Sequence, residues 1–348
     1  MKTFDCLLTE AIRKLPVSLL PHACEIKILS DPATDLVVNV TTYERVLKRT
    51  LLFAIGEVRC PPTHPLFKMG GGPQSCPYID FMRSSVIRAT DSHPPAVLTA
   101  NCANFQNVGS TYQRQILDKR GDFNDWIAVS PSFLGELSAD RASSSRAADG
   151  VFFDREFAPI TPRQYMAQRH INEALSKGAD ITDLAFDEYL AHLVQSVVSN
   201  ADRHWQKQTK PKSSHRPACE THRRDAVEAV KERLAKECWV NHSLANLARS
   251  SHCSISKLVR IFRIETGVSL HAYQQHVRIR MSLQLLKDSS CDLSEIAVHL
   301  GFANHSHFTT VFRRQFGVTP SQFRQDPSSS VVKRFVETPI RASHGLQT

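Results

Sequence analysis

A pattern that occurs twice in the last third of the chain restricts its fold more than any other feature. Seven side chains of one stretch recur, identical or similar, at a constant offset of 50 positions. The first copy holds Ser256, Leu258, Phe262, Arg263, Gly267, Ser269 and Tyr273, and the second Ser306, Phe308, Phe312, Arg313, Gly317, Thr319 and Phe323. A further match, with an offset of 49, pairs Leu244, Leu247 and Ala248 with Leu293, Ile296 and Ala297. Two copies of one helix-turn-helix unit, the second with a turn one residue longer, account for both offsets.

The second copy shows how each unit is built. Residues 306–316 place apolar side chains at helical spacing on one face, namely Phe308, Val311, Phe312 and Phe316. The other face carries Ser306, His307, Thr310 and Arg313. Gly301 suits a tight turn before this helix, and Gly317 is typical of a helix end. We therefore predict an amphipathic helix whose polar face can enter a major groove of DNA.

Capping residues mark the ends of the predicted helices. Ser243 precedes the first unit and Asp292 precedes the second, where Glu295 completes a capping-box pair three positions later. Thr319 and Pro320 supply a cap and a first-turn proline for one more helix. These signals predict that the two units belong to one helical domain.

At these residues the chain resembles the AraC/XylS family of bacterial transcription regulators, over residues 223–325. The motifs are the Gly-Phe turn at 301–302, the Phe-Arg-Arg run at 312–314, the Phe-Gly-Val-Thr-Pro stop at 316–320 and, in the linking helix, Tyr273, Arg278 and Leu285-Leu286. The resemblance implies a sequence-specific regulator, more often an activator. The family commonly carries Arg where this chain has Thr310, whereas the equivalent residue of the first unit is Arg260. We therefore expect less stringent base recognition by the second unit.

The distribution of charge also favours DNA binding. A helix-turn-helix shape alone also occurs in bundles that bind no DNA, and most amphipathic helices simply pack on a core. Here, however, residues 223–325 hold 15 lysines and arginines against 8 aspartates and glutamates, a net charge of +7. Residues 1–222 hold 25 against 24, a net charge of +1. A locally basic module gains affinity by releasing counterions from DNA phosphates.

The polar face of the second helix in each unit is predicted to contact DNA. Arg260 can donate two parallel hydrogen bonds to guanine, and the methyl group of Thr310 can pack on a thymine methyl. The imidazoles of His305 and His307 can contact base edges or be partly buried and structural. Phosphate contacts or surface charges are expected of Lys257, Arg263, Arg313 and Arg314. The predicted DNA-binding set is Ser256, Lys257, Arg260, Arg263, His305, Ser306, His307, Thr309, Thr310 and Arg313.

A linking helix over residues 269–287 is predicted to set the distance between the two units. Its length is ~28 Å at 1.5 Å per residue. That length is close to the ~34 Å repeat of successive major grooves on one face of DNA. One molecule should therefore cover about two helical turns.

The first 200 residues have a different pattern. Short β-rich runs, separated by Pro, Gly, Asn and Asp, lie at 36–41, 51–57, 78–88, 96–100, 112–117 and 126–129. Helices are predicted at 161–176, which opens on Thr161-Pro162, and at 184–198. This order resembles, more loosely, the cupin-like sensor domain of AraC-type regulators, at residues 105–109 with Tyr112 and at 160–165. We expect an α+β multidomain protein, with a cupin-like β-barrel sensor plus helices and an all-α double helix-turn-helix domain.

Composition places the domain boundaries. Residues 203–216 contain five basic and no acidic side chains, with Pro211 among them, which is typical of a tether that can also touch the DNA backbone. The predicted divisions are a sensor and dimerisation domain at 1–202, a linker at 203–222, the DNA-binding domain at 223–327 and a flexible tail at 328–348.

Enzymatic and metal-binding alternatives have weaker support in the sequence. Residues 1–202 lack the His-x-His ligand pair of catalytic cupins, and the one such pair, His305 and His307, belongs to the predicted DNA-reading helix. Cys60, His64 and Cys76 are the nearest alternative set of metal ligands. We expect no cofactor and no catalysis.

Two other functions stay open. An Ada-type repair regulator would need a four-cysteine zinc set near its N-terminus to activate a thiolate, and the spacing of Cys6, Cys24, Cys60, Cys76 and Cys102 is too irregular for one. An architectural DNA-binder that senses nothing would not need 200 folded residues before its DNA-binding module.

The expected partners are double-stranded DNA, a small-molecule effector of unknown identity and RNA polymerase. Arg83, Arg88 and Arg114 suggest an anionic effector or are surface arginines. The helix at 184–198 carries an apolar stripe that either contacts a second copy in a homodimer or packs on its own domain. The stripe consists of Leu184, Leu190, Leu193, Val194 and Val197.

The expected cellular location of the protein rests on two further sequence features. No run approaches the ~18 apolar residues that a membrane-spanning helix requires. The nine cysteines contain no Cys-x-x-Cys pair, which favours reduced thiols. We therefore expect a cytoplasmic protein with no membrane contact.

Overall fold

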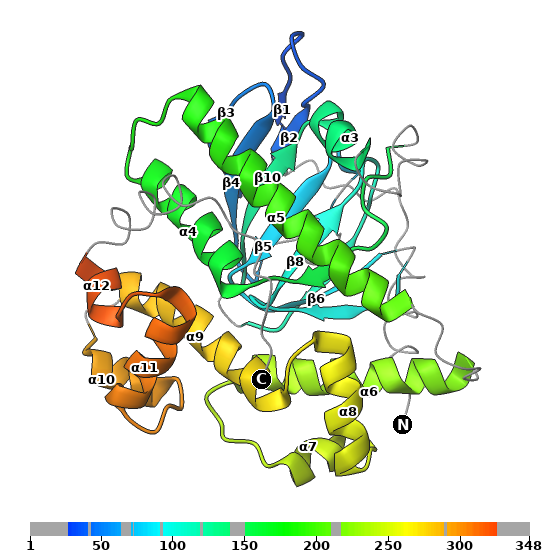
Figure 1. The fold of residues 1–348 in the computed structure, drawn as a ribbon, viewed down its shortest axis with the longest axis vertical. Helices are drawn as coiled ribbons and strands as arrows, with labels where there is room; N and C mark the ends of the chain where they lie inside the picture. The colour runs from blue at the N-terminus through cyan, green and yellow to red at the C-terminus, as the bar shows by residue number, and fades with distance from the viewer. Residues whose placement is uncertain are drawn as a thin grey trace.

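The computed structural model describes residues 27–40, 43–63, 71, 73–90, 93–118, 121–139, 150–209, 217–288 and 291–325. Figure 1 shows a sheet-rich N-terminal part, two helices crossing it, and a helical C-terminal part beside it. The predicted order of strands followed by helices is therefore confirmed. The tail expected at 328–348 lies outside the described residues.

The main sheet has six antiparallel strands in the order β11-β8-β5-β10-β4-β3. Their bounds are Glu44–Arg49 for β3, Phe53–Cys60 for β4, Tyr78–Met82 for β5, Cys102–Gln106 for β8, Asp122–Val129 for β10 and Phe157–Pro159 for β11. Strands β10 and β4 pair along their whole length, from Asp122 opposite Cys60 to Val129 opposite Phe53. Alternate residues enter different cores: Ile55 and Ile127 lie toward the helices, whereas Trp126 packs in a separate cluster with Leu36.

Two smaller sheets complete the N-terminal part. One has the order β7-β6-β9, and the other pairs β1 with β2. Their bounds are Lys27–Leu29 for β1, Val38–Val40 for β2, Val86–Ala89 for β6, Ala96–Leu98 for β7 and Gln113–Ile116 for β9. Within the described residues, no strand pairing joins the sheets into a closed barrel. The closed cupin-like barrel that we expected is therefore not formed by these strands.

The predicted strand at 78–88 explains this difference. It is broken into β5 and β6, which belong to different sheets. At the break, the amides of Arg83 and Ser84 both donate to the carbonyl oxygen of Phe123, at 2.8 and 3.0 Å. A β-rich run reveals a tendency to extend, but the partner of each half is decided by contacts far away in the sequence.

Three helices cover the sheets: α3 at Pro131–Ala139, α4 at Pro162–Ser176 and α5 at Asp183–Thr209. Thr161 caps α4 in a capping box with Gln164, as its Thr-Pro start indicated. Helix α5 continues well past residue 198. Near its end, Trp205 donates to the carbonyl oxygen of Phe157 at 3.0 Å and packs 5.4 Å from the ring of Phe105. Part of the expected linker is therefore helical, and the domain boundaries stay a proposal.

The apolar stripe of α5 packs inside its own chain. Leu190, Leu193, Val194 and Val197 are at most 2% exposed and share a core with the main sheet, whereas Leu184 is 79% exposed. The buried residues offer no surface to a second copy. A homodimer contact through Leu193 is therefore wrong, and packing on its own domain is the correct alternative.

The C-terminal part has seven helices within the described residues. They are α6 at Pro217–Lys236, α7 at Leu244–Ser250, α8 at Ile255–Thr266, α9 at Leu270–Asp288, α10 at Leu293–His299, α11 at His305–Phe316 and α12 at Pro320–Gln325. Ser243 caps α7, and Asp292 forms the expected capping box with Glu295 at α10. The repeat is confirmed as two helix-turn-helix units, α7–α8 and α10–α11, joined by α9.

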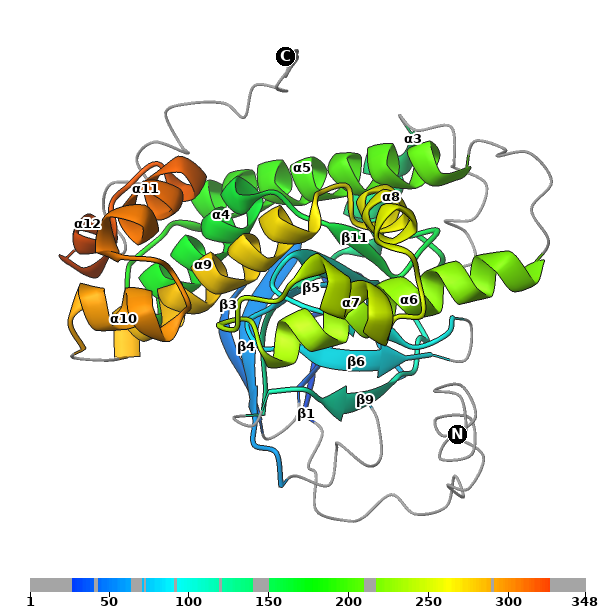
Figure 2. The ribbon, with the colours of Figure 1, turned by 90° about the horizontal axis from the view of Figure 1, so that it is seen from below.

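The two parts of the chain are packed together. Figure 2 shows α6 beside the small sheet of β6, and α11 close to α4. The amide of Val97 donates to Glu228 of α6 at 2.6 Å. The hydroxyl of Tyr273 lies 3.0 Å from that of Thr99. None of the helices in the described ranges is long and apolar enough to cross a membrane.

Candidate DNA-reading surface

The caps and apolar spacing of α8 fix where its side chains point. The hydroxyl of Ser254 accepts from the amide of Lys257 at 3.3 Å, and Gly267 ends the helix at a φ of 76°, which suits glycine. Leu258, Ile261 and Phe262 are buried. The exposed face consists of Ile255, Ser256, Val259, Arg260 and Arg263, and Lys257 is half-buried beside it.

Helix α11 repeats this construction. The side chain of Asn304 accepts from the amide of His307 at 2.8 Å, and Gly317 ends the helix at a φ of 79°. The buried residues are Phe308, Val311 and Phe312. The exposed ones are His305, Ser306, His307, Thr310, Arg313 and Arg314, and Thr309 is half-buried. The predicted DNA-binding residues thus lie on two matching faces, and their contact with DNA remains a proposal.

The two histidines of α11 are exposed. The Nε2 atom of His305 lies 3.2 Å from the hydroxyl of Thr309, one helical turn away. The ring of His307 packs edge-on against Phe302, with centroids 5.5 Å apart. Neither imidazole is buried, so both can meet a base edge. The hydroxyl of Thr309 can therefore hold the ring of His305 in one orientation.

Two apolar residues of this surface, Ile255 and Val259, were missing from the predicted set. Val259 is 40% exposed and lies three positions after Ser256 and one before Arg260. An apolar side chain on an otherwise polar helix face can pack on a thymine methyl. The signal was present in the sequence, because Val259 falls outside the buried stripe of Leu258, Ile261 and Phe262.

The arginines considered as effector ligands or surface charges are buried in ion pairs. Arg88 donates to Asp80 at 3.0 Å, and Arg114 donates to Asp122 at 2.5 Å. Their side chains are 10% and 6% exposed. Arg83 is similarly enclosed, with 9% exposure. The surface interpretation is therefore wrong, and all three charges already have carboxylate partners.

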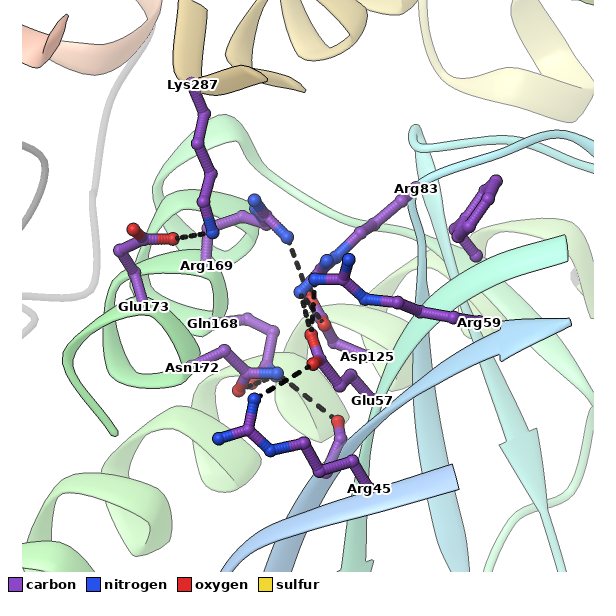
Figure 3. A network of polar contacts seen from close by, with 12 residues as sticks. Arg45, Glu57, Arg59, Arg83, Asp125, Gln168, Arg169, Asn172, Glu173 and Lys287 are labelled. Atoms are coloured by element: carbon purple, nitrogen blue, oxygen red, sulfur yellow. Dashed lines mark hydrogen bonds and ion pairs between the residues drawn. The ribbon is translucent and has the colours of Figure 1, made fainter. Parts of the chain in front are cut away.

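Figure 3 shows the network around Arg83, which ties the sheet to the helices. Arg83 bonds to Asp125 through its Nε at 2.9 Å, and Asp125 also accepts from Arg169 of α4 at 3.2 Å. Burial alone would lower the pKa of Arg83. The negative charges of Asp125 and Glu57 outweigh this effect, so the pKa of Arg83 is raised. Every arginine of this network contacts Glu57 or Asp125, so the network holds the sheet and α4 together.

A pocket of about 340 Å³ lies beside β8 in the N-terminal part. Polar side chains and aromatic rings both line it, among them Asn104, Gln106, Phe105, Phe153 and Tyr112. The guanidinium of Arg88 stacks 3.5 Å from the ring centroid of Tyr112. His93, also in the lining, lies 3.0 Å from Glu156. Such a pocket suits a small polar molecule.

The cysteines in the described part of the chain do not gather with other ligands into a metal-binding group. Within the described ranges, no three His, Cys, Asp or Glu residues are grouped so that they could hold a metal ion. Cys60 and Cys76 are buried and form no disulfide, and His64 lies outside the described residues, as do Cys6 and Cys24. Burial raises the pKa of Cys76 to about 12, which leaves its thiol protonated.

Comparison with known proteins agrees with this geometry. Residues 247–326 match the family model of a helix-turn-helix domain. The regulator MtrA of Neisseria gonorrhoeae is 31% identical over 84 residues, 24% of this chain and 28% of that protein. The transcriptional activator RhaR of Salmonella dublin is 33% identical over 104 residues, 30% of this chain and 37% of that protein. The chain thus spans about a third of the length of these curated relatives.

A solved structure of ToxT from Vibrio cholerae aligns with 72% of this chain and 90% of its own, at 15% identity. Its TM-score of 0.30 is too low to support an inference. The helix-turn-helix match is different, because it includes α8, α9 and α11, where the caps, turns and exposed faces of the repeat are observed. The C-terminal part of the chain thus carries a helix-turn-helix domain of the AraC/XylS type, similar to those of the regulators MtrA and RhaR.

Proposed function

We propose that the whole protein is a sequence-specific transcription regulator that inserts α8 and α11 into successive major grooves. One observation carries the proposal: two helices with matching caps expose polar faces, and α9 joins them in one domain. The 19 residues of α9 extend ~28 Å, close to the ~34 Å groove repeat. Both faces also carry arginines for phosphate contact.

The two reading helices should contribute differently. Arg260 is exposed on α8 and has the bidentate geometry that recognises guanine, whereas α11 carries Thr310 at the equivalent position. We infer that α8 reads bases directly, while α11 contributes more through backbone and shape contacts.

Selection of binding sites from random DNA by the full chain tests this proposal. We expect a bipartite site whose halves are about 10 base pairs apart, with a stronger base preference under α8. Binding of all sequences with equal affinity would contradict sequence-specific regulation. A strong motif under α11 in the unmodified protein would contradict the unequal contributions of the two helices.

We further propose that the N-terminal part senses a small molecule in the pocket beside β8 and that the protein is an activator that contacts RNA polymerase. The polar and aromatic lining supports the first idea, and the similarity of the DNA-binding region to that of the transcriptional activator RhaR supports the second. A homodimer remains part of the proposal, through a surface other than the buried stripe of α5. A thermal-shift screen of metabolites on the full chain tests for an effector. A non-sensing architectural binder would show no ligand-dependent shift.

A further inference from the structure

The two helix-turn-helix units meet at a junction in the middle of α9. The turn after α6, residues 237–243, leads into the first unit, and the turn around Gly301 lies between the two helices of the second. These turns are in direct contact. A Cβ atom on Gly301 would lie 2.1 Å from the carbonyl oxygen of Trp239, and its φ of 75° also favours glycine. The chain therefore has room for glycine alone at this point.

Arg278 of α9 connects the two turns. Its Nε donates to the carbonyl oxygen of Cys238 at 2.5 Å, and its Nη2 donates to that of Val240 at 3.1 Å. Its Nη1 donates to the carbonyl oxygen of Gly301, in the other unit, at 2.8 Å. Gln274, one turn earlier on α9, also donates to Val240, at 2.6 Å. One guanidinium is thus shared between the units.

The charge of Arg278 suits this position for a physical reason. The side chain is buried, and burial lowers its pKa. Within the described residues no carboxylate forms an ion pair with it; its partners are oxygens that follow the C-terminal ends of α6 and α10. Helix C-termini carry partial negative charge, which a cation stabilises. Only the planar fork of arginine can donate in several fixed directions, and the ammonium group of lysine lacks this geometry.

We propose that Arg278 sets the relative position of the two DNA-reading helices and thereby the spacing at which the protein accepts its two half-sites. This inference rests on the proposed function. It makes Arg278 a positioning residue, because its hydrogen bonds are to the protein turns. Without the junction, α9 still joins the units, but their relative rotation is less restricted.

Binding measurements with the full chain on DNA of altered spacing test the proposal. One base pair inserted between the selected half-sites rotates them by about 35° and separates them by about 3.4 Å. For the unmodified protein we expect a loss of at least about tenfold in affinity per inserted base pair. Arg278→Met should lower this penalty to about threefold or less, with a smaller loss at the optimal spacing. Arg278→Lys should resemble Arg278→Met, because it retains the charge without the fork.

Arg280 provides the matched control. It lies on the same helix, is also buried, and bonds to Asn101 and to the carbonyl oxygen of Ile160, at 3.1 Å, in the N-terminal part. Arg280→Met should therefore keep the full spacing penalty. If Arg278→Met fails to fold, Arg278→Lys carries the test, since it keeps the charge and a hydrogen-bond donor at this position without the planar fork.

Three outcomes are distinguishable. A reduced penalty in the Arg278 variants alone supports the inference. An unchanged penalty in folded Arg278 variants, or the same reduction in Arg280→Met, overturns it while leaving sequence-specific binding intact. Absence of specific binding by the unmodified chain at every spacing overturns the proposed function itself.

Discussion

The two helix-turn-helix units have the same internal design but different surroundings. In the first unit, Leu258 and Phe262 belong to a core formed by helices α6 to α9 and the turn after α6. In the second, Phe308 and Phe312 belong to one continuous core with the main sheet and with α4 and α5. The first unit is therefore a separate packing body, whereas the second is an extension of the N-terminal part.

Polar contacts follow the same division. The second unit is held beside α4 by Phe323, which stacks on His170 at 6.3 Å, and α9 is tied there by Lys287, which bonds to Glu173 at 2.6 Å. The core of the first unit reaches the N-terminal part through α6, where Glu228 accepts from the amide of Val97 at 2.6 Å, and through α9, where the hydroxyl of Tyr273 lies 3.0 Å from that of Thr99.

Replacement of one buried phenylalanine in each core should have the largest effect on stability. It also tests whether the two cores are separate. Phe262 and Phe312 are both fully buried, so replacement of either by Ala should destabilise its core by about 3 to 5 kcal/mol. Hydrogen exchange separates the two cases. Phe312→Ala should speed exchange in α4 and α5 as well as α11, whereas Phe262→Ala should speed exchange in α6, α7 and α8 and leave α4 and α5 unchanged. Equal spread from both variants would show that the two cores unfold as one unit.

A second difference concerns DNA. Arg260→Ala removes the bidentate group of α8 and should cost about 1 to 3 kcal/mol on the selected site, with relaxed preference at one base pair and little change in non-specific binding. Affinities for single-base variants of the site provide the measurement. The matched change in α11, Thr310→Ala, should cost less. Equal weakening on every sequence would identify Arg260 as a phosphate contact.

The local part of this architecture was predictable and the long-range part was not. Ser243, Asp292 and Thr161 act as caps within four residues of their own positions, so their sequence context was sufficient. The split of residues 78–88 depends instead on distant strands. Burial of Arg83 was hidden for the same reason, because its partner Asp125 is 42 positions away. Strand β8 was not predicted, since its five residues mix polar and apolar types.

The candidate site shows the same limit. Helical spacing was enough to place Arg260 and Thr310 on exposed faces, because a helix face is a local property. The junction at Arg278 could not be derived this way, since it requires the turns at Cys238 and Gly301, 40 and 23 positions away, to meet. The stripe of α5 was ambiguous because its spacing does not reveal which surface covers it.

The smallest expected effect concerns the ion pair that ties α9 to α4. Burial tends to raise the pKa of Glu173, but the hydrogen bond and charge of Lys287, with help from Arg169 and Lys177, outweigh it and lower that pKa. A carboxyl group with a lowered folded-state pKa adds stability above its unfolded pKa of about 4.3 and loses it as pH falls through the folded value.

Lys287→Met should therefore cost about 1 kcal/mol at neutral pH, in keeping with a partly exposed pair, and almost nothing in acid. Urea unfolding at both pH values provides the measurement. Lys177→Met is the matched control, because Lys177, the C-cap residue of α4, lies 3.4 Å from Glu173, has a side chain that is 48% exposed, and does not join the two parts. A cost for Lys287→Met that stays constant with pH would mean that its alkyl chain, and not its charge, holds the second unit in place.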